Sequence, residues 1–332
     1  MKVLVLGASG FIGQRIVWLL GQSNWATPVI AGRRAAQVSA SSGIERRQVD
    51  TLDLDSLKTA LTDIDAVVNC VAGNGPVIAT GAKLLVEAAL ATSRPRIIHM
   101  SSMAAYGRQE GELSEDAPLD PELGWYAKAK CEAEASMCAY AKAGNQVIML
   151  RPGCVHGPGS EMWVERIARL LVAGRLGNIG AEGDGWSNLI HVDDVAEAVL
   201  LSLRHEPVPQ EASIFNLSAP DSPRWNQYFS DLAMALDAVP VKSVNPKFIK
   251  LDAKIGAPII KISEILLRKL RLPTKFLPVA VPPSLLKLWR QQIKLKHDRA
   301  RDQLHFAPRS YEQGLAESAA WARENGIVRA RH

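Results

Sequence analysis

Cysteine is scarce in this chain of 332 residues, which holds four: Cys70, Cys131, Cys138 and Cys154. No two of them stand in a Cys-x-x-Cys spacing, so the sequence indicates neither a metal site nor a disulfide framework. We therefore expect reduced thiols and a cytoplasmic protein, because disulfides persist mainly in oxidising compartments.

Long apolar runs are lacking as well. No run reaches the roughly 20 residues that a membrane-spanning helix needs. The apolar start at residues 1–6 has no cleavage region behind it, so we interpret it as a strand and not as a signal peptide. Aromatic residues make up 6% of the chain. They form no stacking platform beside the basic residues, so nucleic-acid binding is not expected.

The first fourteen residues predict a nucleotide pocket. A strand-like run ends in Gly7-Ala8-Ser9-Gly10-Phe11-Ile12-Gly13, and an amphipathic helix follows. This arrangement is the first unit of a dinucleotide-binding fold, in which a helix N-terminus offers N–H groups to the pyrophosphate. The alternative is a tight turn without a ligand. The cofactor-binding residues predicted here are Gly7, Ser9, Gly10, Phe11, Ile12 and Gly13.

Strand-like and helix-like segments alternate through the first 150 residues. Helical patterns over residues 55–61, 77–91 and 124–143 separate the strand-like ones. This alternation predicts an α/β fold of the Rossmann type, with a doubly wound parallel sheet covered by helices on both faces. The expected strands here are residues 1–6, 27–31, 46–49, 66–71, 96–100 and 146–150, and a short strand over 213–217 is expected beyond Arg151.

Loops rich in glycine and proline replace this rhythm after Arg151. Helices are still expected over residues 161–173, 192–204 and 225–236. We interpret residues 1–150 as the dinucleotide-binding domain and residues 151–332 as a smaller, interleaved substrate-binding lobe. Part of 185–220 is expected to return to the sheet.

The end of the second strand lacks an acidic residue, which a fold of this type usually places there to bind the ribose of NAD. The strand runs into Arg33-Arg34, and the next acid is Glu45. Two guanidinium groups suit a 2′-phosphate, so we predict NADP(H) as the cofactor, although an exposed arginine pair can also be plain surface. Asp50 and Thr51 either contact the adenine, or Asp50 caps the next turn.

Tyr126 and Lys130 stand four apart in a segment expected to be helical, which places both side chains on one face. A cation beside a phenol favours the phenolate and lowers the pKa of the phenol from about 10. Such a tyrosine can exchange a proton with a carbonyl or alcohol oxygen. A hydroxyl in Ser101-Ser102 could bind the same oxygen. The alternative is a chance surface pair, because short motifs carry false positives.

Five motifs in order make the chain resemble the extended short-chain dehydrogenase/reductase family, also called the epimerase/dehydratase family. GASGFIG (residues 7–13) resembles the family's GxxGxxG, MSSMAAYG (100–107) its strand-five motif and YAKAK (126–130) its YxxxK. RPGCVHGPG (151–159) and HVDDVAEAV (191–199) resemble two further motifs of the family. The resemblance spans nearly the whole chain.

The resemblance implies a mechanism without a metal. Tyr126 would be the general acid/base, and Lys130 would lower the pKa of Tyr126 and hold the nicotinamide ribose. Ser102, four residues before Tyr106, would orient the substrate oxygen. The cofactor carries the hydride. Further cofactor contacts are expected from Val71, Ala72, Pro152 and Val155.

Two departures from the family pattern bear on the substrate. Cys154 stands where members that act on nucleotide sugars usually have asparagine, and cysteine is a poorer hydrogen-bonding group. The connection after Ala72 is short, and Ala79 and Thr80 stand where those members place an asparagine of the catalytic set. The chain therefore resembles the hydroxysteroid dehydrogenase and ketoreductase branch more than the nucleotide-sugar epimerases.

Basic residues gather in the segment 242–301, where 15 Lys and Arg stand against three acids in a chain of net charge +5. We interpret this segment as short amphipathic helices that pack on the substrate lobe and present basic outer faces. One alternative is an apolar lid whose positive rim attracts an anionic handle, such as a coenzyme A or carrier-protein thioester. Another is weak docking on an anionic membrane surface.

The function expected first is NADP(H)-dependent interconversion of a ketone and a secondary alcohol on a fairly apolar substrate. A nucleotide-sugar epimerase or dehydratase is the second choice, and an NADP-binding sensor without turnover the third. His156 and His191 are interpreted as loop or core histidines, because no carboxylate partner is evident in the sequence. Apolar stripes in helices 77–91 and 124–143 either pair in a homodimer or face only the sheet.

Overall fold

The computed structural model describes residues 1–38, 43–270, 272 and 277–327. The chain divides into two compact units, each assembled from three stretches of sequence. The first unit consists of Met1–Gly153, Ile190–Ser218 and Leu295–Pro308. The second consists of Cys154–Leu189, Ala219–Lys294 and Arg309–His332.

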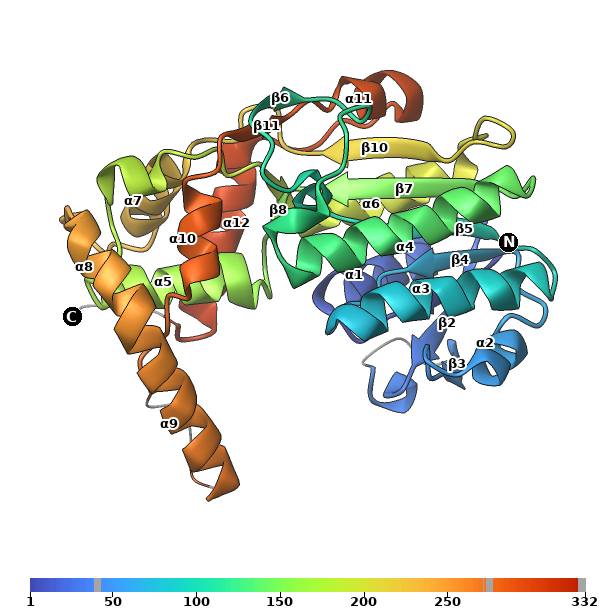
Figure 1. Ribbon diagram of the computed structural model, residues 1–332, viewed down its shortest axis with the longest axis horizontal. Coiled ribbons are helices and arrows are strands. Elements are labelled where there is room, and N and C mark those ends of the chain that lie inside the picture. Colours follow the sequence, from blue (N-terminus) through green and yellow to red (C-terminus); the bar gives the residue numbers. More distant parts are fainter. Residues whose placement is uncertain (39–42, 271, 273–276, 328–332) are drawn as a thin grey trace. The chain divides into compact units, whose positions relative to one another are not determined.

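A seven-stranded sheet in the order β10-β7-β5-β4-β1-β2-β3 forms the centre of the first unit (Figure 1). Every neighbouring pair in it is parallel. This is the doubly wound α/β fold that the sequence predicts, and all seven expected strands are present. Their bounds are β1 (Lys2–Leu6), β2 (Thr27–Gly32), β3 (Glu45–Gln48), β4 (Ala66–Asn69), β5 (Arg96–Met100), β7 (Val147–Pro152) and β10 (Ser213–Leu217).

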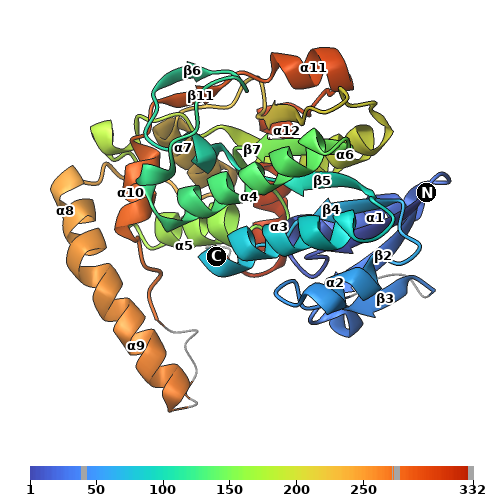
Figure 2. The same ribbon diagram turned by 45° about the vertical axis from the view of Figure 1, so that its right-hand side comes forward.

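Helices cover both faces of this sheet. On one face α2 (Leu54–Ala60), α3 (Gly75–Leu90) and α4 (Trp125–Lys142) pack together, and α1 (Phe11–Gln22) and α6 (Val192–Arg204) pair on the other (Figures 1 and 2). Strands covered on both sides need apolar residues throughout, which explains the continuous apolar runs of the sequence. The shorter elements of the first unit are η1 (Ala35–Gln37), η2 (Met103–Tyr106), β6 (Gly111–Leu113), η3 (Pro121–Leu123) and α11 (Asp298–Leu304).

The apolar stripes of α3 and α4 face the core of the first unit. Seven of the eight stripe residues are fully buried there, and Leu84 packs partly buried against them. The stripes therefore pack in the core of the first unit and do not argue for a homodimer. The homodimer stays a prediction. The buried residues are Leu85, Ala88, Ala89, Ala133, Met137, Tyr140 and Ala141.

An aromatic cluster forms the core of the second unit. The rings of Phe229 and Trp289 lie 5.0 Å apart, and those of Trp225 and Phe229 5.8 Å apart. The helices and strands of this unit and of its junctions are β8 (Cys154–His156), η4 (Glu161–Glu165), α5 (Arg166–Val172), η5 (Gly180–Gly183), β9 (Leu189–His191), α7 (Trp225–Ala235), α8 (Pro246–Leu251), η6 (Asp252–Gly256), α9 (Ala257–Lys269), α10 (Pro283–Trp289), β11 (Ile293–Leu295) and α12 (Tyr311–Glu324).

The basic segment differs from its expected form in one respect. Helices with exposed lysines are present, as expected, but exposed apolar side chains also run along α8, η6 and α9. Among the described residues no helix is long and apolar enough to cross a membrane. Residues 271 and 273–276, which belong to the same segment, lie outside the described part of the chain.

Candidate active site

The glycine turn after β1 is too crowded for side chains. Gly7 has φ +80°, and a Cβ there would stand 2.7 Å from the carbonyl oxygen of Cys70. A Cβ at Gly13 would overlap the carbonyl oxygen of Gly7, so α1 lies directly against the turn. Gly10 caps α1 without a side-chain hydrogen bond. The first N–H groups of the helix are thus available to an anion, which fits the pyrophosphate of a dinucleotide.

The residues predicted to select the cofactor lie beyond the ends of β2 and β3. Arg33 and Arg34 follow β2 directly, and both are exposed. The carboxylate of Asp50 accepts the backbone N–H of Leu52 at 3.0 Å, which is the turn-capping role. Thr51 is half-buried.

A buried polar group lies at the end of β4. Asn69 is 5% exposed, and its amide nitrogen stands 3.2 Å from Nδ1 of His99 in β5. Its amide oxygen accepts the N–H of Val71, which fixes the direction of the chain leaving the strand. Burial, together with the charge of Lys130, lowers the pKa of His99 to about 3, so this imidazole is neutral. Val71 is half-buried and Ala72 is exposed.

Tyr126 and Lys130 lie on one face of α4, as their spacing predicts. The ammonium of Lys130 stands 5.8 Å from the ring centroid of Tyr126. Lys130 is 4% exposed and donates to the carbonyl oxygen of Met100, at the end of β5, over 2.6 Å. The Tyr126 side chain is 37% exposed, so its ring remains accessible to a ligand.

The ammonium of Lys130 is buried, and no neighbouring charge fully compensates for the loss of water around it. Burial lowers the pKa of its ammonium to about 8, and the nearby Cys70 and Glu134 offset only part of this shift. Burial also raises the pKa of the Cys70 thiol to about 12, so this thiol is uncharged at neutral pH. Lys130 and Cys70 are neighbours, and Cys70 also touches the glycine turn. The Tyr126–Lys130 pair and the turn therefore lie at the same edge of the sheet.

The free energy of unfolding is expected to depend on pH through Lys130. Its pKa falls from 10.5 to about 8 on folding, so between these pH values the unfolded chain binds the additional proton. The stability contribution of this site therefore rises with pH across that window, by up to about 3 kcal/mol, because one pKa unit corresponds to about 1.4 kcal/mol. Urea unfolding measures the free energy of unfolding of the wild type and of Lys130→Met at several pH values. As the pH rises across this window, the wild type should gain stability relative to Lys130→Met. Parallel pH profiles would contradict the assignment.

The two serines after β5 have different surroundings. Ser101 is buried and donates to the Glu134 carboxylate over 2.5 Å. Ser102 is half-buried, and its hydroxyl oxygen accepts the N–H of Ala104 at 3.2 Å, which caps η2. The hydroxyl hydrogen of Ser102 is left to donate to another group. The surroundings of the two side chains therefore favour Ser102 over Ser101 as the residue that binds a substrate oxygen.

A buried ion pair beneath these serines was missed in the sequence. Arg151, at the end of β7, donates to both oxygens of Glu134 over 2.9 and 2.7 Å. It also donates to the hydroxyl of Tyr106 over 2.9 Å, and that hydroxyl donates to Asn216 over 2.6 Å. One signal was present: Glu134 follows Lys130 by four positions on the same helix face. The partner, 17 positions further on, could not be inferred from spacing.

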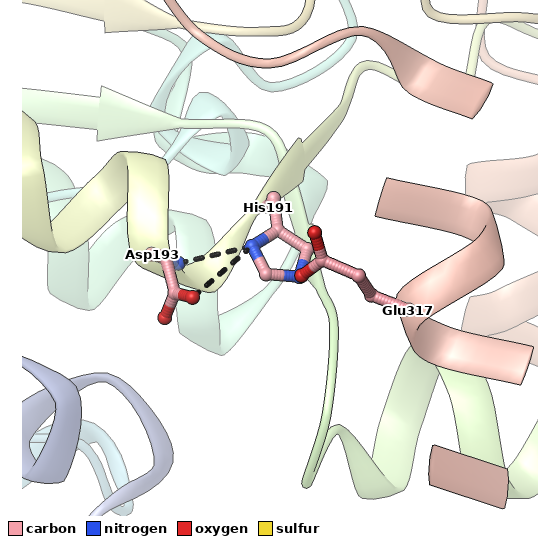
Figure 3. A group of neighbouring side chains, drawn as sticks. All are labelled: His191, Asp193 and Glu317. Atoms are coloured by element: carbon pink, nitrogen blue, oxygen red, sulfur yellow. Dashed lines mark hydrogen bonds and ion pairs between the residues drawn. The ribbon is translucent and has the colours of Figure 1, made fainter. Parts of the chain in front are cut away.

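His191 has the carboxylate neighbour that the sequence did not reveal. Nδ1 of His191 accepts the N–H of Asp193 at 3.2 Å and lies 3.9 Å from the Asp193 carboxylate (Figure 3). Asp193 is in turn bound by the guanidinium of Arg15 in α1. These contacts join α6 to α1, so a structural role explains them. Glu317, also drawn in Figure 3, belongs to the second unit.

Other predicted residues fall on both sides of the boundary between the units. Pro152 is buried in the first unit at the end of β7, where it pairs with Leu217. Val155 and Cys154 belong to the second unit. Cys154 is buried, and burial raises the pKa of its thiol. His156, in the same unit, is buried with Nδ1 at 3.1 Å from the Ser318 hydroxyl, which fits a core histidine.

Comparison with known proteins decides the family. A model of the NAD dependent epimerase/dehydratase family matches residues 3–218, more than half of the chain. The chain belongs to this family. The matched region contains the glycine turn, Ser102, Tyr126 and Lys130, so the motifs that carry the resemblance in the sequence lie inside it.

Two relatives share about a quarter of their aligned residues with this chain. "Protein YeeZ" of Escherichia coli K12 is 27% identical over 257 residues, which cover 72% of this chain and 86% of that protein. The 2-alkyl-3-oxoalkanoate reductase of Stenotrophomonas maltophilia is 26% identical over 226 residues, 61% of this chain and 65% of the reductase.

Solved structures show the same fold. The UDP-glucuronic acid 4-epimerase from Bacillus cereus, in complex with UDP-glucuronic acid and NAD, aligns with a TM-score of 0.74. The alignment covers 98% of this chain and 100% of the epimerase at 19% identity. The family is enzymatic and uses a nicotinamide cofactor, which agrees with the glycine turn and the tyrosine–lysine pair.

Proposed function

We propose that this chain is an NADP(H)-dependent oxidoreductase that interconverts a ketone and a secondary alcohol on a fairly apolar substrate. The observation that carries the proposal is the meeting of two motifs at one edge of the sheet. Cys70 touches the glycine turn through its carbonyl and is a neighbour of Lys130, which in turn lies beside Tyr126. A nucleotide-binding turn and an acid/base pair are the two parts that such a reaction needs.

Each residue is given a role that its surroundings permit. The bound cofactor supplies or accepts the hydride. Tyr126 exchanges the proton with the substrate oxygen, the ammonium of Lys130 stabilises the phenolate, and the hydroxyl of Ser102 donates to the same oxygen. The first N–H groups of α1 hold the pyrophosphate. Val71, Ala72, Pro152 and Val155 remain proposed contacts of the cofactor.

The choice of NADP over NAD rests on the charges near the end of β2. Arg33 and Arg34 are exposed there. The first acid after them, Glu45, pairs across from Val29 in the middle of β2 and forms ion pairs with Lys2 and Arg47. Glu45 is thus held at the opposite end of the sheet, because Lys2 begins β1. Two guanidinium groups that directly follow β2, where folds of this type usually place the acid that binds NAD, favour a 2′-phosphate.

Replacing both arginines tests this choice. Arg33→Ala with Arg34→Ala is expected to weaken NADPH binding at least about tenfold, since even one charge-assisted hydrogen bond to the phosphate contributes about 1.5–3 kcal/mol. NADH binding should change less than about twofold, because NADH has no 2′-phosphate. Titration calorimetry measures both. Lys58→Ala with Lys83→Ala, on α2 and α3 of the same unit, is the control. Equal losses of affinity for NADPH and NADH would contradict the proposal that Arg33 and Arg34 bind the 2′-phosphate.

A nucleotide-sugar epimerase or dehydratase is the second candidate. The solved structures of similar fold favour it, since several are named as such enzymes with NAD. Cys154 and the Ala79-Thr80 pair argue against it, because they replace the hydrogen-bonding groups that the resemblance leads one to expect. NADPH-dependent reduction of apolar ketones, assayed beside cofactor-neutral turnover of sugar nucleotides, separates the two. The reductase relative supports the first reading.

Four further expectations stay predictions. A binding-only sensor is disfavoured by the intact Tyr126–Lys130 pair. A cytoplasmic location follows from the cysteine pattern, and the four cysteines are free thiols in the structure. A homodimer, or an anionic thioester handle on the substrate, can be tested by sedimentation and by a thermal-shift screen of ketones and thioesters with NADPH present.

A further inference from the structure

The helices α8, η6 and α9 form one continuous helical stretch (Figures 1 and 2). A row of exposed apolar side chains runs along this stretch and ends at Leu270, directly after α9. The residues recur every three or four positions, so they form one stripe on the helix surface. Each is between 51% and 69% exposed. This apolar stripe consists of Phe248, Leu251, Ile255, Ile259, Ile262, Leu266 and Leu270.

Contacts on another side of the helix fix its orientation and leave the apolar stripe exposed. Ile249, Ala253 and Ala257 are buried within the second unit, to which the helix belongs. Asp252 binds Arg175 over 2.6 Å, and Lys250 binds Glu182 over 2.9 Å. The helix is therefore anchored through its first half, and the face with the stripe is left uncovered by the described residues.

Lysines flank the apolar stripe in a regular way. Five of them stand directly before a stripe residue, about 100° further round the helix, so they form a row along one side of the stripe. All five are exposed. Lys250 and Lys261 pair with acids, at Glu182 and Glu264. The lysine row consists of Lys247, Lys250, Lys254, Lys261 and Lys269.

We propose that the apolar stripe and the lysine row dock this protein on an anionic phospholipid bilayer. A helix lying in the interface inserts an apolar face between lipids while long lysine side chains reach the headgroups. Both parts are present here, in adjacent rows, and the positive charge matches an anionic surface. A second copy of the chain is a poorer occupant, because two lysine rows would be brought together. The inference does not depend on the proposed function.

Co-sedimentation with vesicles tests the proposal. The wild type is expected to bind vesicles of phosphatidylcholine with one third phosphatidylglycerol, and to bind pure phosphatidylcholine at least about tenfold more weakly, as the charge of several lysines implies. Raising the salt from about 0.1 M to about 1 M should reduce binding to the anionic vesicles, because the Debye length falls from about 10 Å to about 3 Å.

Two sets of variants separate the apolar and the charged contributions. Ile259→Gln, Ile262→Gln and Leu266→Gln together should reduce partitioning roughly a hundredfold or more, given the area removed from the bilayer. Glutamine keeps the helix propensity, and circular dichroism checks that the helix remains. Lys247→Gln, Lys254→Gln and Lys269→Gln should weaken binding only to anionic vesicles. The matched control is Trp18→Gln, Val208→Gln and Met234→Gln, which are exposed apolar residues elsewhere.

Three results would overturn the proposal. One is a wild type that stays in the supernatant with both kinds of vesicle. Another is a stripe variant that binds as well as the control variant. The third is a concentration-dependent dimer, seen by ultracentrifugation without lipid and lost in the stripe variant, because the stripe would then cover a second copy of the chain.

Discussion

A Tyr126→Phe variant is expected to bind NADPH as the wild type does and to lose between about a hundredfold and ten-thousandfold in turnover, the range that a positioned acid/base group contributes. The change removes one oxygen atom and leaves the ring above Lys130 in place. The 37% exposed side chain is not part of the core, so folding should be unaffected. Fluorescence titration of NADPH and steady-state rates of ketone reduction measure the two effects separately.

Tyr140→Phe is the matched control on the same helix. The Tyr140 hydroxyl donates to the carbonyl of Pro95 over 2.9 Å, and the residue is buried. It lies 14 positions beyond Tyr126, about 21 Å along α4 at 1.5 Å per residue. We expect it to cost about 1 kcal/mol of stability and no turnover. If Tyr126→Phe keeps its activity, another group transfers the proton and the assignment is wrong.

The part of the site that depends on local spacing could be predicted from the sequence. The crowding at Gly7 and Gly13 follows from a strand–turn–helix pattern, and the shared face of Tyr126 and Lys130 follows from a separation of four in a helix. The surroundings of Lys130 could not be predicted. The contacts that bury it come from Met100, at the end of β5, and from Cys70, directly after β4, and no local pattern reveals how these strand ends lie relative to α4.

The parallel sheet could also be predicted from local patterns. In the second unit, local patterns predict helices but not their contacts. Continuous apolar runs between helical patterns indicate a parallel sheet covered on both faces, and the strands β1, β2, β4, β5 and β7 follow this pattern. In α8 and α9 the same kind of periodicity locates the helix but not what its apolar face touches. Ile249 and Ile259 are alike in the sequence, yet one is 2% and the other 57% exposed.

The largest change in stability is expected from Glu134→Gln. Glutamine keeps the volume and can still accept from Ser101, but it removes the charge that neutralises Arg151. The side chains of Glu134 and Arg151 are 2% and 3% exposed, so the guanidinium would be left buried without a counter-charge. Breaking such a pair costs about 3–5 kcal/mol. Glu132→Gln, whose exposed partner Lys128 lies 4.0 Å away, should cost less than about 1 kcal/mol.

A double replacement tells whether the ion pair stabilises the fold or positions the site. Glu134→Leu with Arg151→Met removes both charges, and apolar pairs of this kind often match or exceed a buried ion pair in stability. We expect urea unfolding to show most of the loss recovered. Turnover should stay low even so, because Ser101 loses its acceptor and the neighbouring Ser102 is no longer fixed. Full turnover in a stable double variant would show that the Glu134–Arg151 pair stabilises the fold and does not position the site. A Glu134→Gln protein as stable as Glu132→Gln would show that water reaches the Arg151 guanidinium.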